Sequence, residues 1–268
     1  MITIPPEKIL FTDRKGNTLP LEEVIADGLD GGYEERVPAL MELVKTGSPY
    51  YRLMACIVLT SWGHRLGFET IIDWASDLTA VPWARESVTV DRIYSADDAF
   101  ENLADALRTS YWNDTTPDLR KMQRDTARAL LRIYPQVFFG RTLALALLRD
   151  KIWQSYGQSE IAKTILTSIN TAQTGKKLSF DLTFQTASLL LVLARANDEL
   201  TAKFAESLLS YFPANDRMLR EIALALRDGQ GPATLRVLDK LQRLGRPNVV
   251  VEVKKSLALR QGKADFMT

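Results

Sequence analysis

The sequence is poor in the residues that build most catalytic and metal centres. Its 268 residues include one cysteine, Cys56, and one histidine, His64. A lone thiol excludes an internal disulfide, and one imidazole without a cysteine pair excludes the common zinc-binding patterns. Cys56 lies in an apolar helical pattern, so we expect a buried small hydrophobe. His64 lies at a predicted helix end, where we expect the helix dipole to favour it.

Long apolar runs are also missing. The richest segments, 143–148 and 188–194, are short and flanked by charge, which argues against a membrane-spanning helix. Residues 1–7 contain neither the cationic region nor the apolar core of a signal peptide, which predicts a cytoplasmic protein. The glycine-rich segment 27–32 lacks both the Lys-Ser/Thr pair and the preceding strand of a phosphate loop. We therefore expect no catalytic residues, no cofactor and no metal ion.

What the sequence does contain is a regular alternation of apolar stretches with helical period and short turns rich in Gly, Pro and Asp. The predicted helices span 20–28, 33–46, 49–65, 67–77, 96–110, 118–133, 141–156, 158–173, 178–195, 197–211, 215–228, 232–244 and 247–261. In the segment 215–228 one helix face carries an apolar stripe: Met218, Leu219, Ile222, Ala223 and Leu226. The preceding Asn215 or the adjacent Asp216 is suited to cap that helix.

Two stretches depart from this rhythm. Residues 1–19 contain a turn at 13–17 between short apolar segments, which predicts a small irregular or β-hairpin cap. Residues 78–95 have no clear period and predict an irregular loop. The remaining helix pairs, between residues 20 and 262, predict a single elongated all-α domain over 1–268. Its expected architecture is an α-solenoid of antiparallel helix pairs.

Charge is divided unevenly along the chain. Residues 1–105 contain 18 Asp/Glu against 9 Lys/Arg, and residues 106–268 contain 15 Asp/Glu against 25 Lys/Arg. In a solenoid, sequence order is spatial order, so we expect an acidic N-terminal region and a basic C-terminal region. One end is then suited to a basic partner and the other to an acidic one.

One predicted helix carries residues in the order typical of the second helix of a HEAT repeat: Asp216, Arg220, Ala223, Ala225 and Leu226. It follows a helix that contains Leu208 and Leu209. In these residues the chain resembles HEAT-repeat proteins, with weaker similarity at 52–59 and 249–259. The resemblance implies an α-solenoid and favours a binding scaffold, because HEAT-like proteins are chiefly scaffolds and less often enzymes.

The first candidate binding surface is cationic. The predicted helix 118–133 carries three arginines at four-residue intervals: Arg120, Arg124 and Arg128. If this is the second helix of a pair, it lines the inner wall of the superhelix. Cations of other repeats would join it there: Arg217, Arg220 and Lys254. Ordinary solvated helix faces explain the same charges, so both interpretations stay open.

The second candidate surface is aromatic. Four aromatic residues fall at or beside turns around the long loop: Trp74, Trp83, Tyr111 and Trp112. Such side chains act as binding anchors when they are exposed. The alternative is that they pack the loop against the helices.

These features support a non-enzymatic protein-binding scaffold as the leading hypothesis. A more specific form is a bacterial immunity or antitoxin-like protein that binds a toxin domain and covers its active site. The rival hypothesis is a nucleic-acid-binding HEAT-like protein such as an alkylpurine DNA glycosylase. There, Trp112 would stack on the lesion and Asp114 would be the candidate acid, beside Arg120. The acidic first third of the chain argues against that rival, because it repels phosphate.

Overall fold

The computed structural model describes residues 4–91, 95–113, 116–229 and 231–262, and over these residues the chain is helical with no strand. Within them, extended pairing is confined to two isolated antiparallel bridges, Thr12 with Thr18 and Val90 with Asp97. The all-α prediction is therefore confirmed. The chain divides into two compact units, residues 1–133 and 134–268. The expectation of a single elongated domain stays a prediction.

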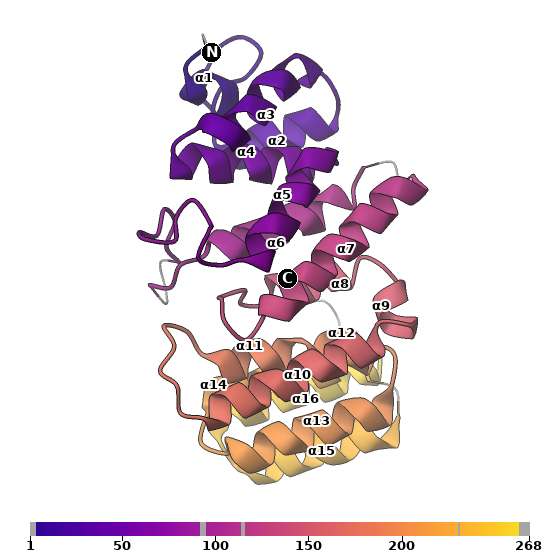
Figure 1. Cartoon of the computed structure of the whole chain (residues 1–268). Coiled ribbons are helices and arrows are strands. Elements are labelled where there is room, and N and C mark those ends of the chain that lie inside the picture. The colour runs from indigo at the N-terminus through magenta and orange to yellow at the C-terminus, as the bar shows by residue number, and fades with distance from the viewer. Residues whose placement is uncertain (1–3, 92–94, 114–115, 230, 263–268) are drawn as a thin grey trace. The chain divides into compact units, whose positions relative to one another are not determined.

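Unit 1 is built around one buried helix. Its elements are α1 (Pro6–Leu10), α2 (Leu21–Leu29), the 3-10 helix η1 (Glu34–Arg36), α3 (Val37–Thr46), α4 (Pro49–Ser61), α5 (Arg65–Ser76), α6 (Ala99–Ser110) and α7 (Pro117–Ile133). Every residue of α4 from Leu53 to Ser61 is buried. This helix contacts α1, α2, α3, α5 and α6, and α5 packs against α7 (Figure 1).

The N-terminal cap is a short helix followed by a turn. Pro6 occupies the first turn of α1, where its fixed φ favours the helix, and Ile9 and Leu10 are buried. Asp13 then accepts hydrogen bonds from the backbone amides of Lys15 and Asn17, both at 2.8 Å, which closes the predicted turn. The predicted cap therefore combines the helix α1 with a tight antiparallel turn, in which Thr12 pairs with Thr18. This pairing is a single bridge, and the described residues of the cap contain no β-strand.

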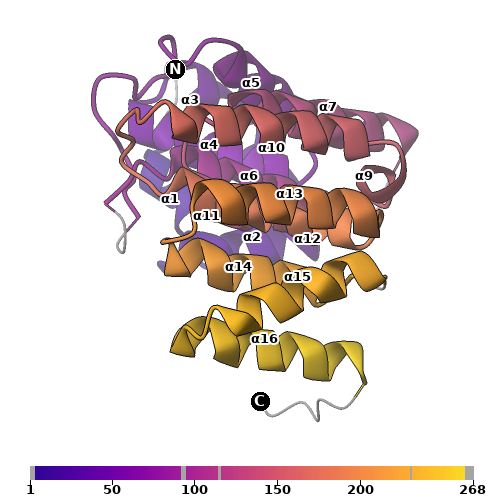
Figure 2. The same cartoon turned by 90° about the horizontal axis from the view of Figure 1, so that it is seen from below.

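Unit 2 consists of α8 (Thr142–Leu147), α9 (Ile152–Ser155), α10 (Gln158–Gln173), α11 (Leu182–Ser188), α12 (Leu190–Ala194), α13 (Asp198–Tyr211), α14 (Asp216–Leu226), α15 (Pro232–Arg243) and α16 (Pro247–Arg260). Helix α13 contacts α10 and α15, and α14 contacts α11, α12 and α16. Figure 2 shows α10, α13, α15 and α16 lying one after another. The apolar stripe predicted for residues 215–228 is buried along its whole length.

Side-chain caps fix where several helices of unit 2 begin. Asn197 accepts a hydrogen bond from the amide of Leu200 at 3.0 Å, and Asn215 accepts one from the amide of Met218 at 3.1 Å. Each cap satisfies a backbone donor that the first helical turn leaves without a partner. The predicted cap at Asn215 is confirmed.

No helix within the described parts of the chain combines the length and the apolar character that crossing a bilayer requires.

Candidate functional site

The two tryptophans nearest the long loop belong to the core of unit 1. Trp74 of α5 is 6% exposed and Trp83 of the loop is 4% exposed, and their rings meet edge to face with centroids 4.9 Å apart. Trp83 also packs against Phe100 of α6 at 5.9 Å. Apolar burial of both indoles holds the loop on the helices. They are core residues and not exposed anchors, which corrects the prediction that Trp74 and Trp83 bind a partner.

The turn between α6 and α7 leaves a large aromatic side chain in solvent. Trp112 is 69% exposed, whereas the adjacent Tyr111 is half-buried. The guanidinium carbon of Arg120 lies 5.2 Å from the centroid of the Tyr111 ring, within the range of a cation–π contact. The structure therefore brings together three of the predicted site residues. Asp114, the acid of the glycosylase-like alternative, lies outside the described residues.

Side-chain amides hold the described start of this turn. Gln123 of α7, which is buried, donates to the carbonyl oxygen of Ser110 at 3.0 Å and to its hydroxyl at 3.1 Å. Asn113, which is half-buried, donates to the carbonyl oxygen of Ser61, at the end of α4, at 2.8 Å. These bonds tie residues 110–113 to α4 and α7.

The predicted cationic face of α7 carries charges of both signs. Arg120, Arg124 and Arg128 lie along one side of the helix, as their spacing predicts. Asp125 pairs with Arg128 at 3.3 Å and with Lys121 at 2.6 Å. Part of the cationic charge is therefore compensated within α7, and such exposed pairs contribute little to stability.

Unit 2 holds one predicted cation in a structured environment. The guanidinium carbon of Arg217 lies 3.7 Å from the centroid of the Phe184 ring, and that of Arg141 lies 5.6 Å from it. Arg141 Nε also lies 2.7 Å from both carboxylate oxygens of Glu221, which is fully buried. Burial raises the pKa of the Glu221 carboxyl, and the bond to Arg141 opposes that shift. The other predicted cations of this unit are exposed: Arg220 and Lys254. That these cations form one continuous surface with the arginines of α7 stays a prediction.

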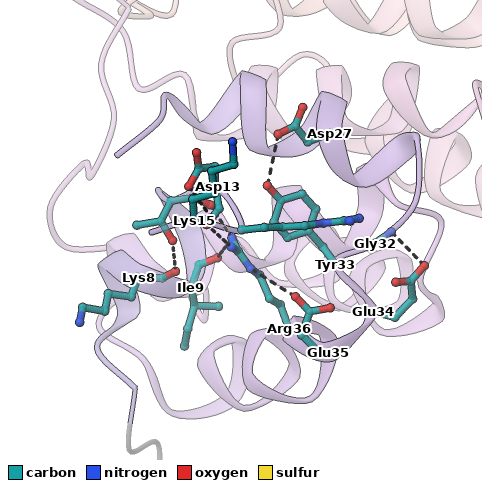
Figure 3. Close-up of polar contacts among 12 residues, drawn as sticks. Lys8, Ile9, Asp13, Lys15, Asp27, Gly32, Tyr33, Glu34, Glu35 and Arg36 are labelled. Carbon is teal, nitrogen blue, oxygen red and sulfur yellow. Dashed lines mark hydrogen bonds and ion pairs between the residues drawn. The ribbon is translucent and has the colours of Figure 1, made fainter. Parts of the chain in front are cut away.

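A second cluster, which the sequence did not indicate, joins the N-terminal segment to η1 (Figure 3). Arg36 donates to the carbonyl oxygens of Ile9 at 3.1 Å, Thr12 at 2.7 Å and Asp13 at 3.0 Å. Its guanidinium carbon lies 4.1 Å from the centroid of the Tyr33 ring. No local pattern marks Arg36, because its partners precede it by 23 to 27 residues.

A hollow of about 330 Å³ lies beside this cluster. It is lined by Asp13, Arg14, Lys15, Asp27, Asp30 and Tyr33. The hydroxyl of Tyr33 donates to the carboxylate of Asp27 at 3.2 Å, and burial together with this bond raises the pKa of Tyr33. Because the lining carries both signs of charge, it selects neither anions nor cations. We assign this cluster a structural role in holding the N-terminal segment.

The cysteine and the histidine do not form a reactive centre. Cys56 is fully buried, as expected, and burial raises the pKa of its thiol to about 12, so the thiol stays protonated. His64 directly precedes α5, and burial lowers its pKa. The backbone amide of His64 also donates to the carbonyl oxygen of Leu59 at 2.8 Å, so the residue lies between the end of α4 and the start of α5. A favourable contribution from the dipole of α4 stays a prediction. Among the described residues no group of three or more His, Cys, Asp or Glu is placed to hold a metal ion.

Two contacts between arginines and aromatic rings involve predicted site residues. In the α6–α7 turn, Arg120 lies over the ring of Tyr111, next to the exposed Trp112. In unit 2, Arg141 and Arg217 lie over the ring of Phe184, which is buried. Comparison with protein-family models, curated proteins and solved structures found no match for the chain.

Proposed function

We propose that the chain is a non-enzymatic protein-binding scaffold built from HEAT-like helix pairs, with the α6–α7 turn as a docking surface. The observation that carries this proposal is Trp112, 69% exposed, next to the contact between Arg120 and Tyr111. The few residues that dominate the binding energy of protein interfaces are enriched in Trp, Tyr and Arg. The anchored turn presents all three residue types together, which favours a macromolecular partner.

Polar contacts between alternate helices of unit 2 support the helix-pair architecture. Asp198, at the start of α13, accepts hydrogen bonds from the amides of Gly231 and Ala233 at the start of α15. Asp216, at the start of α14, pairs with Arg246, which directly precedes α16. Helices whose starts meet side by side run in the same direction. Alternate helices in a stack of antiparallel pairs have this relationship.

Contacts at the far end of α16 support the antiparallel direction within a pair. Arg260, the last residue of α16, donates to the carbonyl oxygen of Gly231 at 2.9 Å and to the hydroxyl of Thr234 at 2.8 Å. Both acceptors lie at the start of α15. The end of one helix therefore meets the start of the helix before it, as in an αα-hairpin.

Affinity purification with matched variants tests the proposed docking surface. Tyr156, 85% exposed in unit 2, provides the control for loss of an exposed aromatic ring. We expect the wild type and Tyr156→Ala to retain the same stoichiometric polypeptide, and Trp112→Ala to retain at least about tenfold less, the effect of a modest hot spot. Recovery of the wild-type chain alone at low salt would contradict the proposal.

An immunity or antitoxin-like role is the more specific form of this proposal. It is supported by the uneven charge of the chain, which suits a charged partner. If the retained polypeptide is a toxin domain, co-expression with the wild type should suppress its toxicity. Co-expression with Trp112→Ala should leave the cells sensitive.

Nucleic-acid binding is the outcome that would replace the proposal. In that case the chain retains duplex DNA, and retention falls steeply as salt is added. Release of alkylated bases that depends on Asp114, tested with Asp114→Asn, would further identify a glycosylase. Absence of DNA retention at low salt removes this alternative.

A further inference from the structure

Unit 2 contains a hollow of about 490 Å³, a volume within the range of small-molecule and side-chain binding pockets. The loop between α10 and α11 forms one side, and the turn between α13 and α14 forms the other. It is lined by Ala172, Lys176, Leu178, Phe180, Asp181, Leu182, Thr183, Tyr211, Phe212, Pro213, Ala214 and Asn215. Every one of these residues lies within unit 2.

The walls of this hollow present aromatic surface. Tyr211 is 55% exposed, and its ring contacts that of Phe212 edge to face with centroids 6.4 Å apart. Phe180 is fixed by packing against Phe138 at 5.9 Å. Together with Leu178 and Pro213 these rings form a lining suited to a bulky apolar side chain.

The polar side chains of Asp181, Thr183 and Asn215, which line the hollow, already have partners. The side-chain amide of Asn215 donates to the carboxylate of Asp181 at 3.0 Å and to the hydroxyl of Thr183 at 2.8 Å. The other carboxylate oxygen of Asp181 accepts from the amide of Phe184 at 3.0 Å. These bonds tie the two walls together, so the hollow is preorganised. An occupant gains little by competing for them and is selected by apolar contact.

The charged residues of the lining are Lys176 and Asp181. The carboxylate of Asp181 is engaged by the hydrogen bonds from Asn215 and the amide of Phe184, whereas Lys176 and the adjacent Lys177 are exposed with no ion pair within the described parts of the chain. Asp216, which follows Asn215, is paired with Arg246, which also donates to the carbonyl oxygen of Ala214 at 3.1 Å. Unit 2 as a whole contains 19 Lys/Arg against 12 Asp/Glu. An anionic occupant is therefore favoured.

We propose that this hollow binds an acidic peptide segment of a partner protein, with a bulky apolar side chain inserted beside Tyr211 and Phe212. Carboxylates that flank the inserted side chain face Lys176 and Lys177. The proposal rests on the proposed protein-binding function and gives it a second docking place. This place lies in unit 2, away in sequence from Trp112, so the two can be tested separately.

Selection from a display library of random peptides on the full chain tests the proposal directly. We expect the enriched peptides to combine acidic residues with Leu, Phe or Trp. Synthesised with a fluorescent label, they should bind Tyr211→Ala at least about tenfold more weakly than the wild type. The double variant Lys176→Glu with Lys177→Glu should also weaken binding, and added salt should weaken wild-type binding through the same charges.

Three controls make the outcomes distinct. Tyr156→Ala should bind the selected peptides like the wild type, and Trp112→Ala should do so too. Failure to enrich acidic and apolar peptides, or equal binding to Tyr211→Ala, would overturn the hollow as a site. A single-stranded oligonucleotide tests whether the site binds anions in general. If it competes as well as the peptides do, and only the double lysine variant loses binding, the site is a general anion-binding patch and the proposal is wrong. If Trp112→Ala is the only variant that loses peptide binding, the peptide site lies in unit 1. The hollow is then not the site, but the proposed protein-binding function still stands.

Discussion

The carboxylate of Asp198 accepts the hydroxyl hydrogen of Thr234, 36 residues further along the chain, and also accepts hydrogen bonds from three backbone amides. Those amides belong to residues 231, 233 and 234, at the start of α15. Asp198 therefore caps α15 from a different helix, where donors would otherwise lack partners. Burial acts to raise the pKa of Asp198, but these hydrogen bonds outweigh it and hold the pKa below its usual range.

Replacing this cap should destabilise unit 2. Asp198→Ala leaves the amides of Gly231, Ala233 and Thr234 without their acceptor, so we expect a loss of about 2 kcal/mol in the free energy of unfolding. Asp239→Ala is the control, because Asp239 makes an exposed pair with Arg243 and should change stability by less than about 0.5 kcal/mol. Urea unfolding of both variants measures the difference. Equal stability would show that water replaces the cap.

The buried amide of Gln185 makes four hydrogen bonds to one segment of backbone. It donates to the carbonyl oxygens of Tyr134 at 2.9 Å and Val137 at 3.1 Å. It accepts from the amides of Phe139 at 2.7 Å and Gly140 at 3.2 Å. We expect Gln185→Leu to lower the free energy of unfolding by about 3 kcal/mol or more, because four backbone groups lose their partner in a buried site.

Hydrogen exchange locates the effect of that substitution. The amides of Phe139 and Gly140 should lose protection first in Gln185→Leu, since they donate directly to the missing oxygen. Gln173→Leu, at the exposed end of α10, provides the control and should leave both amides protected. Unchanged protection in Gln185→Leu would mean that Gln185 does not hold this segment.

Helical period was sufficient to locate most of the helices. The prediction of 158–173 matches α10 at both ends, and 232–244 differs from α15 by one residue. The predicted helix 178–195 is instead divided into α11 and α12. Residues 184 to 194 are all buried, including the polar residues Gln185, Thr186 and Ser188. Burial therefore extends around every face of the segment, and no change of period marks the break.

Contacts between distant segments explain what could not be predicted. Trp83 and Trp112 both lie beside turns, yet one is in the core and the other in solvent. Whether such a tryptophan is buried depends on whether another side chain can pack against its ring. Trp83 has that partner in Trp74 of α5. Arg36 and Gln185 likewise act on backbone groups far away in sequence. Local pattern cannot identify such pairs.

The N-terminal segment should depend on the planar shape of Arg36. Three carbonyl oxygens share the two terminal nitrogens of its guanidinium, which also contacts the Tyr33 ring. The compact ammonium of Arg36→Lys cannot reproduce that geometry. We expect amide exchange over residues 8–19 to become at least about tenfold faster, the equivalent of losing about 1.4 kcal/mol of local stability. Arg65→Lys, at an exposed pair with Glu69, should leave exchange unchanged.

His64 should make stability fall as the pH drops below about 6.5. Burial lowers its pKa in the folded chain, so the unfolded chain binds the proton more readily. Stability linked to His64 is therefore fully present above the unfolded value of about 6.5 and is lost as the pH falls through the lower folded value. The effect should stay below about 1 kcal/mol, because His64 is half-buried and solvent screens its charge.

Comparison with His64→Asn separates the contribution of His64 from that of the carboxyl groups, which titrate at a somewhat lower pH in both proteins. Asn serves equally as the residue before α5, so the helix start is preserved. The stability of the wild type minus that of His64→Asn should be constant near pH 8 and should fall on acidification. A difference that rises on acidification would mean that the folded chain stabilises the imidazolium. The field at the end of α4 would then outweigh burial at this position.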